Sequence, residues 1–211
     1  MLIPNVFELI DAWRADAPGR PAPRAVLHVG AHECEELGLY NSRGLQAHWV
    51  EAQPRLVQLM RDRGVHVIQA AVAETAGTYV PFYVTNNSQS SSMLPLKTHA
   101  QEHPHVHVTT TIVVQTRRLD EIMDTEHIGA DVNFANLDIQ GVELEALKSL
   151  GDKIAQFDFI YSEVNERELY AGCALLPEMD AWLASKGFER NVMNMTQHGW
   201  GDALYVRVRA A

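Results

Sequence analysis

Ala25-Val-Leu-His-Val-Gly-Ala-His-Glu-Cys-Glu-Glu-Leu-Gly38 is the stretch of sequence that decides the fold. Its first part, Ala25–Val29, is apolar apart from one histidine and stops at Gly30, which is the pattern of a buried strand. The polar residues that follow give way to Leu37 and Tyr40 at helical spacing. Strand, glycine turn and helix form the ligand-binding corner of a doubly wound α/β fold, where ligands lie beyond the carboxyl ends of the strands. We therefore expect the functional site at this corner.

The segments around this corner alternate between strand and helix patterns. Strands are predicted at 46–51, 65–72, 132–138 and 157–163, helices at 54–64, 119–123, 143–150 and 177–186, further β-branched runs at 77–84 and 106–114, and a terminal antiparallel pair at 188–195 and 203–208. Such alternation predicts a parallel sheet with helices on both faces. We expect one domain over 1–211, in which 1–24 form an amino-terminal helix and a Pro-rich connector.

Composition limits the classes of partner. The chain has 211 residues and a formal net charge of −10, whereas affinity for nucleic acid depends on Lys and Arg. Cys34 and Cys173 are the two cysteines and have no ligand spacing, so neither a disulfide framework nor a metal motif is indicated. No basic region followed by an apolar core opens the chain, and no apolar run approaches the ~20 residues that span a bilayer. We expect a cytoplasmic protein without nucleic-acid or membrane partners.

The residues after Gly30 favour a cationic ligand over a phosphate. A dinucleotide fingerprint needs two further glycines, but this chain has His32, Glu33 and Glu35 there. Acidic residues at a helix N-terminus oppose phosphate and favour a cation such as S-adenosylmethionine, which has a sulfonium, an amino group and no phosphate. Glu51 lies 21 residues after Gly30 at a predicted strand end, where an acid binds ribose hydroxyls, although a solvated strand-end charge is an equal alternative for Glu51 alone.

The chain resembles the FkbM-type S-adenosylmethionine-dependent methyltransferases. The resemblance runs through His28–His32, Val50–Pro54, Gln69–Val72, Ser90–Ser92, Arg118–Asp120, Asn136–Glu143, Ser162–Val164 and Leu183–Phe188. It implies a class I methyltransferase (Rossmann-like) fold, with a mostly parallel seven-stranded sheet, helices on both faces and an antiparallel terminal strand. It also implies O-methyl transfer to a small-molecule hydroxyl acceptor such as a sugar, a polyketide or a related natural product.

The resemblance assigns roles to individual residues as well. Cofactor binding would fall to Gly30, Ala31, His32 and Glu51, with Ala70 or Ala71 near the adenine and Asp138 beside the sulfonium. The family often has Asp where His28 stands and commonly has a second glycine where Cys34 stands. Two other functions stay open: a nicotinamide-dinucleotide oxidoreductase, and a binding protein of the same fold without catalysis.

Two acids at predicted strand ends are the main catalytic candidates. Asp138 and Glu163 would meet at the carboxyl edge of adjacent parallel strands, with Asn165 two residues further on. Methyl transfer to oxygen needs an aligned acceptor and a group that removes a proton. These oxygens suit Mg²⁺, which would lower the pKa of the hydroxyl. Alternatively His198 is the base, or a surface histidine, and Asp138 only caps a helix or holds the loop at Gly141.

Three further features have both a functional and a structural interpretation. The histidines His99, His103, His105 and His107 show no metal-ligand spacing, so a solvated strand face is favoured over a metal site. The loop Ser88–Ser92 covers the acceptor site or is a flexible linker, and Trp200 lines that site or packs on the last strand. The helix around Trp13 packs on its own sheet or on a second copy, as in a homodimer.

Overall fold

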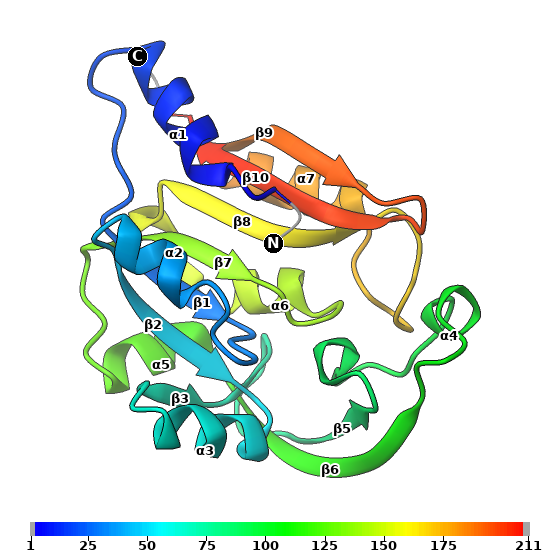
Figure 1. The fold of residues 1–211 in the computed structure, drawn as a ribbon. Helices are drawn as coiled ribbons and strands as arrows, with labels where there is room; N and C mark the ends of the chain where they lie inside the picture. Colours follow the sequence, from blue (N-terminus) through cyan, green and yellow to red (C-terminus); the bar gives the residue numbers. More distant parts are fainter. Residues whose placement is uncertain (1–2, 209–211) are drawn as a thin grey trace.

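A computed structural model describes residues 3–208 and has at its centre the predicted seven-stranded sheet. Its strand order is β3-β2-β1-β7-β8-β10-β9, and β10 alone runs antiparallel to its neighbours (Figure 1). These strands are β1 Ala25–Val29, β2 Gln46–Glu51, β3 Val67–Gln69, β7 Val132–Leu137, β8 Phe159–Asn165, β9 Phe188–Met195 and β10 Trp200–Arg207. The order reverses between β1 and β7, so the opening corner lies at the switch point where ligands bind in such sheets.

Helices cover both faces of this sheet. The helices are α1 Val6–Ala15, α2 Leu37–Ser42, α3 Pro54–Asp62, α4 His99–Glu102, α5 Leu119–Thr125, α6 Glu143–Lys148 and α7 Leu176–Ser185, with 3-10 turns η1 Ser88–Ser90 and η2 Gly151–Gln156. Apolar side chains of α1, α2 and α3 share one core cluster, and those of α5, α6 and α7 share another. The longest helices have ten residues, and no helix within 3–208 is long and apolar enough to cross a membrane.

A second, three-stranded sheet corrects the expectation of a single strand over 65–72. Strand β3 ends at Gln69, and β4 Ala71–Val72 leaves the main sheet to pair with β6 Val108–Arg117, which also pairs with β5 Tyr79–Thr85. The break falls at Ala70, whose backbone N–H donates to Glu51 O at 2.9 Å before the chain turns away. Figure 1 shows β5, β6 and α4 extending past the carboxyl ends of β2 and β7. This insertion therefore forms one side of the ligand site.

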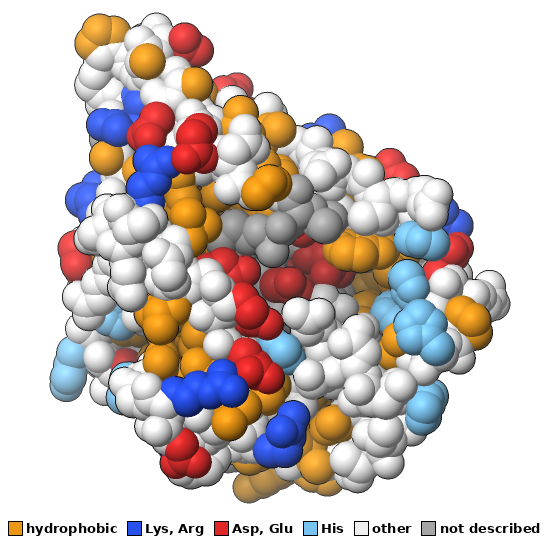
Figure 2. Space-filling view, in the orientation of Figure 1, with side chains coloured by type: hydrophobic (Ala, Val, Ile, Leu, Met, Phe, Trp, Pro, Cys, Tyr) orange, Lys and Arg blue, Asp and Glu red, His pale blue; other side chains and the backbone are white. Residues whose placement is uncertain are grey.

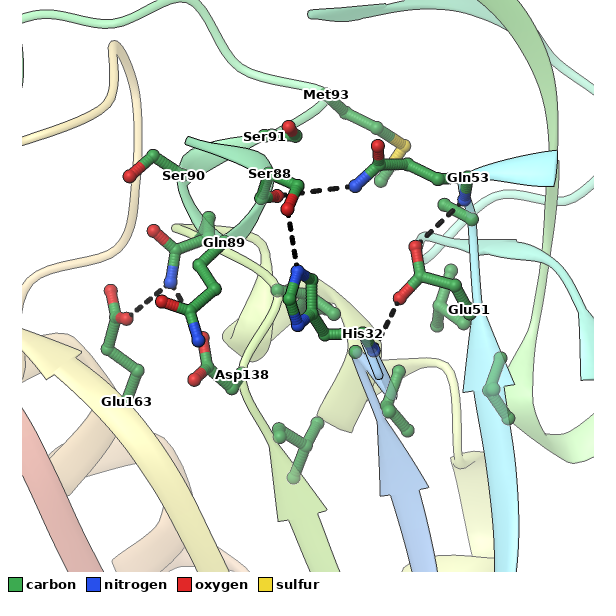
Figure 3. A pocket seen from close by; sticks show the side chains of 18 of the residues that line it. His32, Glu51, Gln53, Ser88, Gln89, Ser90, Ser91, Met93, Asp138 and Glu163 are labelled. Atoms are coloured by element: carbon green, nitrogen blue, oxygen red, sulfur yellow. Dashed lines mark hydrogen bonds between the residues drawn. The ribbon is translucent and has the colours of Figure 1, made fainter. Parts of the chain in front are cut away.

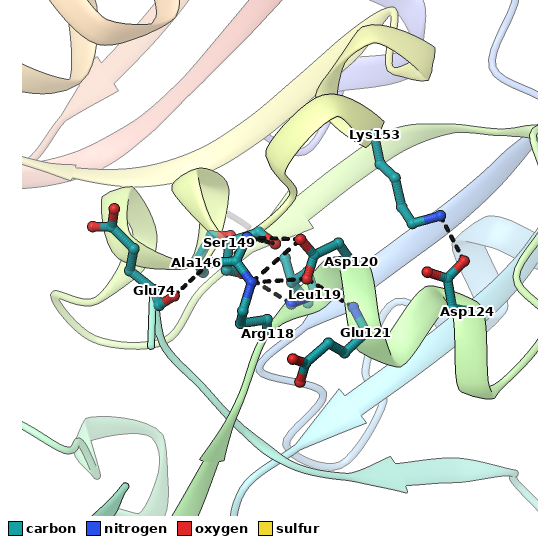
Figure 4. Close-up of polar contacts among 9 residues, drawn as sticks. All are labelled: Glu74, Arg118, Leu119, Asp120, Glu121, Asp124, Ala146, Ser149 and Lys153. Atoms are coloured by element: carbon teal, nitrogen blue, oxygen red, sulfur yellow. Dashed lines mark hydrogen bonds and ion pairs between the residues drawn. The ribbon is translucent and has the colours of Figure 1, made fainter. Parts of the chain in front are cut away.

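Arg118 joins three elements at the far end of β6 (Figure 4). Its guanidinium donates to Asp120 Oδ2 at 2.6 Å, to the carbonyl of Ser149 at 3.1 Å and to the carbonyl of Glu74 at 2.5 Å. The Ser149 hydroxyl in turn accepts the Leu119 N–H at 2.9 Å. The Arg118–Asp120 motif thus connects β6, α5 and α6, and it contributes no residue to the ligand cavity.

Strand ends at the carboxyl edge differ slightly from the sequence prediction. Strand β7 stops at Leu137, so Asp138 directly follows it as expected. Strand β8 continues to Asn165, so Glu163 lies inside a strand instead of at its end. The antiparallel strand β10 places Asp202 directly opposite Glu163. The edge of the sheet therefore brings three acids together where two were predicted.

Candidate active site

A cavity of about 410 Å³ opens at the carboxyl ends of the central strands. This volume is within the range of small-molecule sites. Its floor comes from β1, β2, β7 and β8, and its other walls come from η1 and from the segment that contains α4. Figure 2 shows acidic side chains gathered in the central hollow and histidine side chains at the side near α4. The cavity thus has an acidic end and a histidine end.

The turn after β1 requires glycine at position 30. Gly30 has φ +90°, and a Cβ there would lie 1.8 Å from the carbonyl oxygen of Asp138. Its N–H and that of Ala31 both donate to Val50 O at 2.9 Å, which fixes the loop against β2. Gly30 lines the cavity, as predicted for a cofactor residue, whereas the Ala31 side chain is buried in the core. Ala31 can therefore contribute only through its backbone.

Glu51 has the geometry of a ribose acceptor. Its carboxylate accepts the His32 N–H at 2.9 Å and the Gln53 N–H at 2.8 Å, so two backbone donors hold it in place (Figure 3). Burial raises the pKa of this carboxyl, and these N–H groups oppose the rise. Both oxygens keep lone pairs for further donors, and Ala70 and Ala71 line the adjoining wall. The solvated-charge alternative is wrong, since Glu51 is only 6% exposed.

His32 connects this corner to the serine loop. Its Nδ1 lies 2.7 Å from Glu35 Oε1, and its Nε2 lies 2.7 Å from the Ser88 hydroxyl. Gln53 donates to the Ser88 carbonyl at 3.3 Å (Figure 3). The hydrogen bond with Glu35 raises the pKa of His32. Residues 88–91 of the serine loop thus form a wall of the cavity, and these hydrogen bonds hold it in place, so the flexible-linker alternative is wrong.

At the acidic end the structure brings Asp138 and Glu163 together. The Gln140 side-chain amide donates to Asp138 Oδ1 at 2.6 Å and to Glu163 Oε2 at 2.7 Å. Tyr170 donates in turn to Gln140 Oε1 at 2.5 Å. Enclosure by the protein raises the pKa of Asp138 to about 6, with Asp202 adding to the rise. Burial raises the pKa of Glu163 well above its usual range, and Asp138 and Glu143 add to it.

Asp138 does not cap α6, and its contact with the loop at Gly141 is the hydrogen bond that it accepts from the Gln140 side chain. Glu143 instead accepts the Ile139 N–H at 2.9 Å and the Gly141 N–H at 3.0 Å, and α6 begins with Val142 as its N-cap. The Asp138 carboxyl is open to the cavity. A role for Asp138 toward a ligand therefore remains.

Asp202 and Gln140 are site residues that the sequence did not reveal. Asp202 lines the cavity, is 6% exposed and accepts a hydrogen bond from the Tyr161 hydroxyl. Its position follows from the pairing register of β10 with β8, which local pattern does not encode. The sequence feature that could have revealed Asp202 is its place next to the apolar run Ala203–Val206. Burying a carboxyl group within a strand costs free energy unless the group is hydrogen-bonded or functional.

The charges in the cavity have one sign. Six carboxyl groups line it: Glu35, Glu36, Glu51, Asp138, Glu163 and Asp202. Within residues 3–208, no lysine or arginine is part of the lining. Like charges in an enclosed site favour a cation and oppose a phosphate. The part of the cavity that these acids line therefore suits S-adenosylmethionine and disfavours a dinucleotide pyrophosphate.

The family of the chain follows from comparison with known families. The model described as "Methyltransferase FkbM domain" matches residues 27–190. The chain belongs to this family. The match begins within β1 and ends within β9, contains β2, β3, β7 and β8 whole, and includes Glu51, Asp138 and Glu163 but not Asp202. The strand order and the antiparallel β10 are those of the class I methyltransferase fold expected from the resemblance.

One curated protein and two solved structures are reported as similar to this chain. The 2-O-methyltransferase NoeI of Sinorhizobium fredii (strain NBRC 101917 / NGR234) is 30% identical over 83 residues, which are 39% of this chain and 34% of NoeI. The match thus spans about a third of that curated relative. A low-resolution structure of WbdD is 15% identical with a TM-score of 0.50, over 98% of this chain and 36% of that one. Magnesium protoporphyrin IX methyltransferase from Synechocystis PCC 6803 with bound SAM is 11% identical with a TM-score of 0.46, over 97% and 79%. At these identities the structural likeness concerns the fold alone.

In this FkbM family chain the proposed magnesium site is not supported. Residues 3–208 contain no group of three His, Cys, Asp or Glu side chains that could hold a metal ion. The amide of Gln140 places a hydrogen-bond donor between Asp138 and Glu163, where a cation would need an oxygen. Asn165 is buried, its Oδ1 has no hydrogen-bond partner, and it does not line the cavity. The three predicted ligands are therefore not arranged around one cation.

The remaining candidates lie toward the histidine end. His198 does not line the cavity, and its Nδ1 lies 2.8 Å from Glu102 Oε2. Trp200 does line it, and so do His99, His103 and His105. Because His99 is only 5% exposed, the prediction that these histidines form a solvated face is wrong for His99. His198 could reach a reacting hydroxyl only from behind the lining residues.

The two departures from the family pattern have local explanations. His28 is buried, lies 3.0 Å from the Tyr40 hydroxyl through Nδ1 and packs on Trp49 with ring centroids 4.7 Å apart. Burial lowers its pKa to about 3, so His28 adds no charge to the cavity that it lines. Cys34 adopts φ +55°, a conformation that favours glycine, with its thiol buried and unpaired. The family's glycine would relieve that strain.

Proposed function

We propose that the protein is an S-adenosylmethionine-dependent O-methyltransferase that acts on a hydroxyl of a small molecule. The observation that supports this most is the cavity lined by six carboxyl groups, with Glu51 at one end and the Asp138–Glu163 pair at the other. The family supports methyl transfer, and the name of NoeI favours oxygen as the acceptor atom. Sugars and polyketides are the acceptor classes that we propose.

The residues of the corner fit the cofactor in three places. Glu51 would accept the ribose hydroxyls, because its lone pairs face the cavity beside a fixed backbone. Ala70 and Ala71 are small and apolar, so they leave room for a flat adenine against the wall. Gly30 would allow close approach of the ligand to the backbone of β1.

The acidic end fits the reacting groups. S-adenosylmethionine supplies an electrophilic methyl group on a cationic sulfur. Asp138 lines the cavity and would stabilise that positive charge. The acceptor oxygen would bond to the methyl carbon as the carbon–sulfur bond breaks, and the hydroxyl proton must go to a base.

Glu163 is the base that the geometry favours. It is 4% exposed, lines the cavity and is linked to Asp138 by the Gln140 amide. Its raised pKa means that it readily holds a proton, and a cation nearby would favour its ionised form before transfer. His198 would serve as a base only if the segment around Trp200 rearranged, since it lies outside the lining.

Calorimetry and a methyl-transfer assay test this proposal. We expect heat of binding with S-adenosylmethionine and S-adenosylhomocysteine and none with NAD. A panel of sugar and polyketide hydroxyls with labelled S-adenosylmethionine should yield an O-methyl product. Glu163→Gln should lower kcat by roughly a hundredfold or more, as for loss of a general base, while the exposed Glu189→Gln control retains activity.

Each contrary outcome has a distinct meaning. Heat only with NAD would support the oxidoreductase alternative and contradict the proposal. Cofactor binding without any product over the panel would support a binding protein of the same fold. Full activity of Glu163→Gln together with loss of activity in His198→Gln would move the base to His198.

A further inference from the structure

Four histidines gather at the side of the cavity near α4. His103 is at their centre: its ring centroid lies 4.9 Å from that of His99, 4.8 Å from that of His198 and 6.1 Å from that of His105. His99, His103 and His105 line the cavity, and His198 lies behind them. Figure 2 shows pale blue histidine side chains beside the acidic hollow. We call these four residues the histidine cluster.

His99 has a buried polar atom without a partner. The residue is 5% exposed, and its Nδ1 has no hydrogen-bond partner within the described chain. Leaving such a group unpaired costs about 1–3 kcal/mol, so an unpaired buried nitrogen at a cavity wall calls for an explanation. The ring also packs against Tyr170, with centroids 5.4 Å apart, so it is held in position. The Nδ1 atom itself is enclosed, so a ligand in the cavity would pair with it only if the His99 ring turned toward the cavity.

The charges around the cluster leave its imidazoles available to an anion. The nearest carboxylate, Glu102, is 2.8 Å from His198 Nδ1 and 3.3 Å from Arg167 Nη1, so its charge is balanced locally. Elsewhere the titratable groups of the described lining are carboxyl groups, His28, His32 and Tyr161. His28 is held neutral, and the His32 ring is bonded to Glu35 and Ser88. The histidine cluster is therefore the one part of the described lining suited to negative charge.

We propose that the histidine cluster is a binding subsite for an anionic group, a carboxylate or a phosphate. Imidazole N–H groups of His99 and His103 would donate to its oxygens, with His105 and Trp200 at the sides. If the proposed function holds, that anionic group belongs to the methyl acceptor. The acceptor would then carry a negative charge at one end and place a hydroxyl at Asp138 and Glu163 with the other.

Protonation of the cluster should accompany binding. Burial lowers the pKa of both His99 and His103, and neighbouring histidines add to the effect. His103 also faces Glu102, which acts in the opposite direction. The cluster therefore resists protonation when empty, whereas an anion favours the charged imidazoles and raises those pKa values. Affinity for an anion should accordingly increase as the pH falls from about 8 to about 6.

The test uses inorganic phosphate and acetate as probes on the whole chain. Histidine ring signals are followed by NMR during titration at about pH 6 and about pH 8, with and without S-adenosylhomocysteine. We expect saturable binding of one or both anions that shifts the His99 and His103 signals and is tighter at the lower pH. His99→Gln and His103→Gln should each weaken binding about tenfold, and the exposed His66→Gln control should not change it. Comparison of phosphate with acetate identifies the anion.

The outcomes separate this subsite from the proposed function. Absence of saturable binding for both anions, or binding that neither His99→Gln nor His103→Gln weakens, would overturn the subsite. Binding of S-adenosylmethionine is measured independently, and its failure would contradict the proposed function while leaving the anion result valid. Once an acceptor that is methylated has been identified, His103→Gln should raise the KM for that acceptor, whereas Glu163→Gln should lower kcat.

Discussion

The preference for S-adenosylmethionine over S-adenosylhomocysteine should depend on pH. The two molecules share the ribose, adenine, amino and carboxyl groups and differ in the methyl group on sulfur and in the positive charge that comes with it. Asp138 is the proposed partner of that charge, and its pKa is raised to about 6. Below this pH the carboxyl is protonated and neutral, so it attracts the sulfonium only after losing its proton. The affinity ratio of the two ligands should therefore rise with pH.

The size of this effect follows from linkage. For each pH unit below its pKa, deprotonating Asp138 costs ~1.4 kcal/mol. At about pH 5 the largest expected effect is therefore a roughly tenfold loss of affinity for S-adenosylmethionine. The Asp138 carboxyl is open to the cavity, and solvent screening there reduces its interaction with a charge. We therefore expect the ratio to increase about threefold to tenfold between about pH 5 and about pH 7.

Calorimetric titration of both ligands at each pH measures the ratio. Asp138→Asn removes the group that titrates near pH 6 and should flatten the rise between about pH 5 and about pH 7. Glu33→Gln is a matched control, because Glu33 pairs with Arg63 at 2.8 Å and does not line the cavity. It should retain the rise. A ratio that stays constant over this range in the unmodified protein would refute the placement of the sulfonium beside Asp138.

Two further changes test the fold beneath the site. Gly30→Ala places a Cβ 1.8 Å from the Asp138 carbonyl oxygen, so we expect urea unfolding to show that the free energy of unfolding falls by roughly 3 kcal/mol or more. Gly44 also has positive φ, but a Cβ there meets nothing within 4 Å, so the control Gly44→Ala should lower it by only about 1–2 kcal/mol. Arg118→Lys removes the bidentate hydrogen bonding to Asp120 and should lower the free energy of unfolding by about 1–3 kcal/mol. A changed affinity for S-adenosylmethionine in this variant would contradict a purely structural role of Arg118.

Local pattern was enough to predict most of the sheet. Strands β1, β2 and β9 begin and end where the sequence predicted, because each apolar run is bounded by a residue that stops it. The division of 65–72 could not be predicted in this way. Ala71 pairs with Thr116 of β6, 45 residues later, and the preference for that partner lies in long-range packing. The small second sheet was missed for the same reason.

The site was predicted in part for a similar reason. Asp138 follows β7 and Glu163 lies near the end of β8, which is adjacent and parallel to β7, so topology alone brings them to one edge. Asp202 reaches that edge on the antiparallel β10, and its position depends on register. Gln140 adopts φ +58° and so points its amide between the two acids, which no propensity would predict for this residue. Such a donor is also what makes a magnesium site unsupported here.

The same register gives the acidic edge an energetic meaning. Asp202 and Glu163 are directly opposite in an antiparallel pair, an arrangement that destabilises a sheet when both carry charge. The protein without ligand relieves this by the raised pKa of Glu163, because a protonated carboxyl no longer repels its neighbour. A positive charge in the cavity would relieve it instead by attraction, so that Glu163 could ionise. The opposed pair of Asp202 and Glu163 therefore lowers stability when no ligand is bound and becomes favourable with a bound cation. Departures from the usual pairing preferences of strands are expected at functional sites.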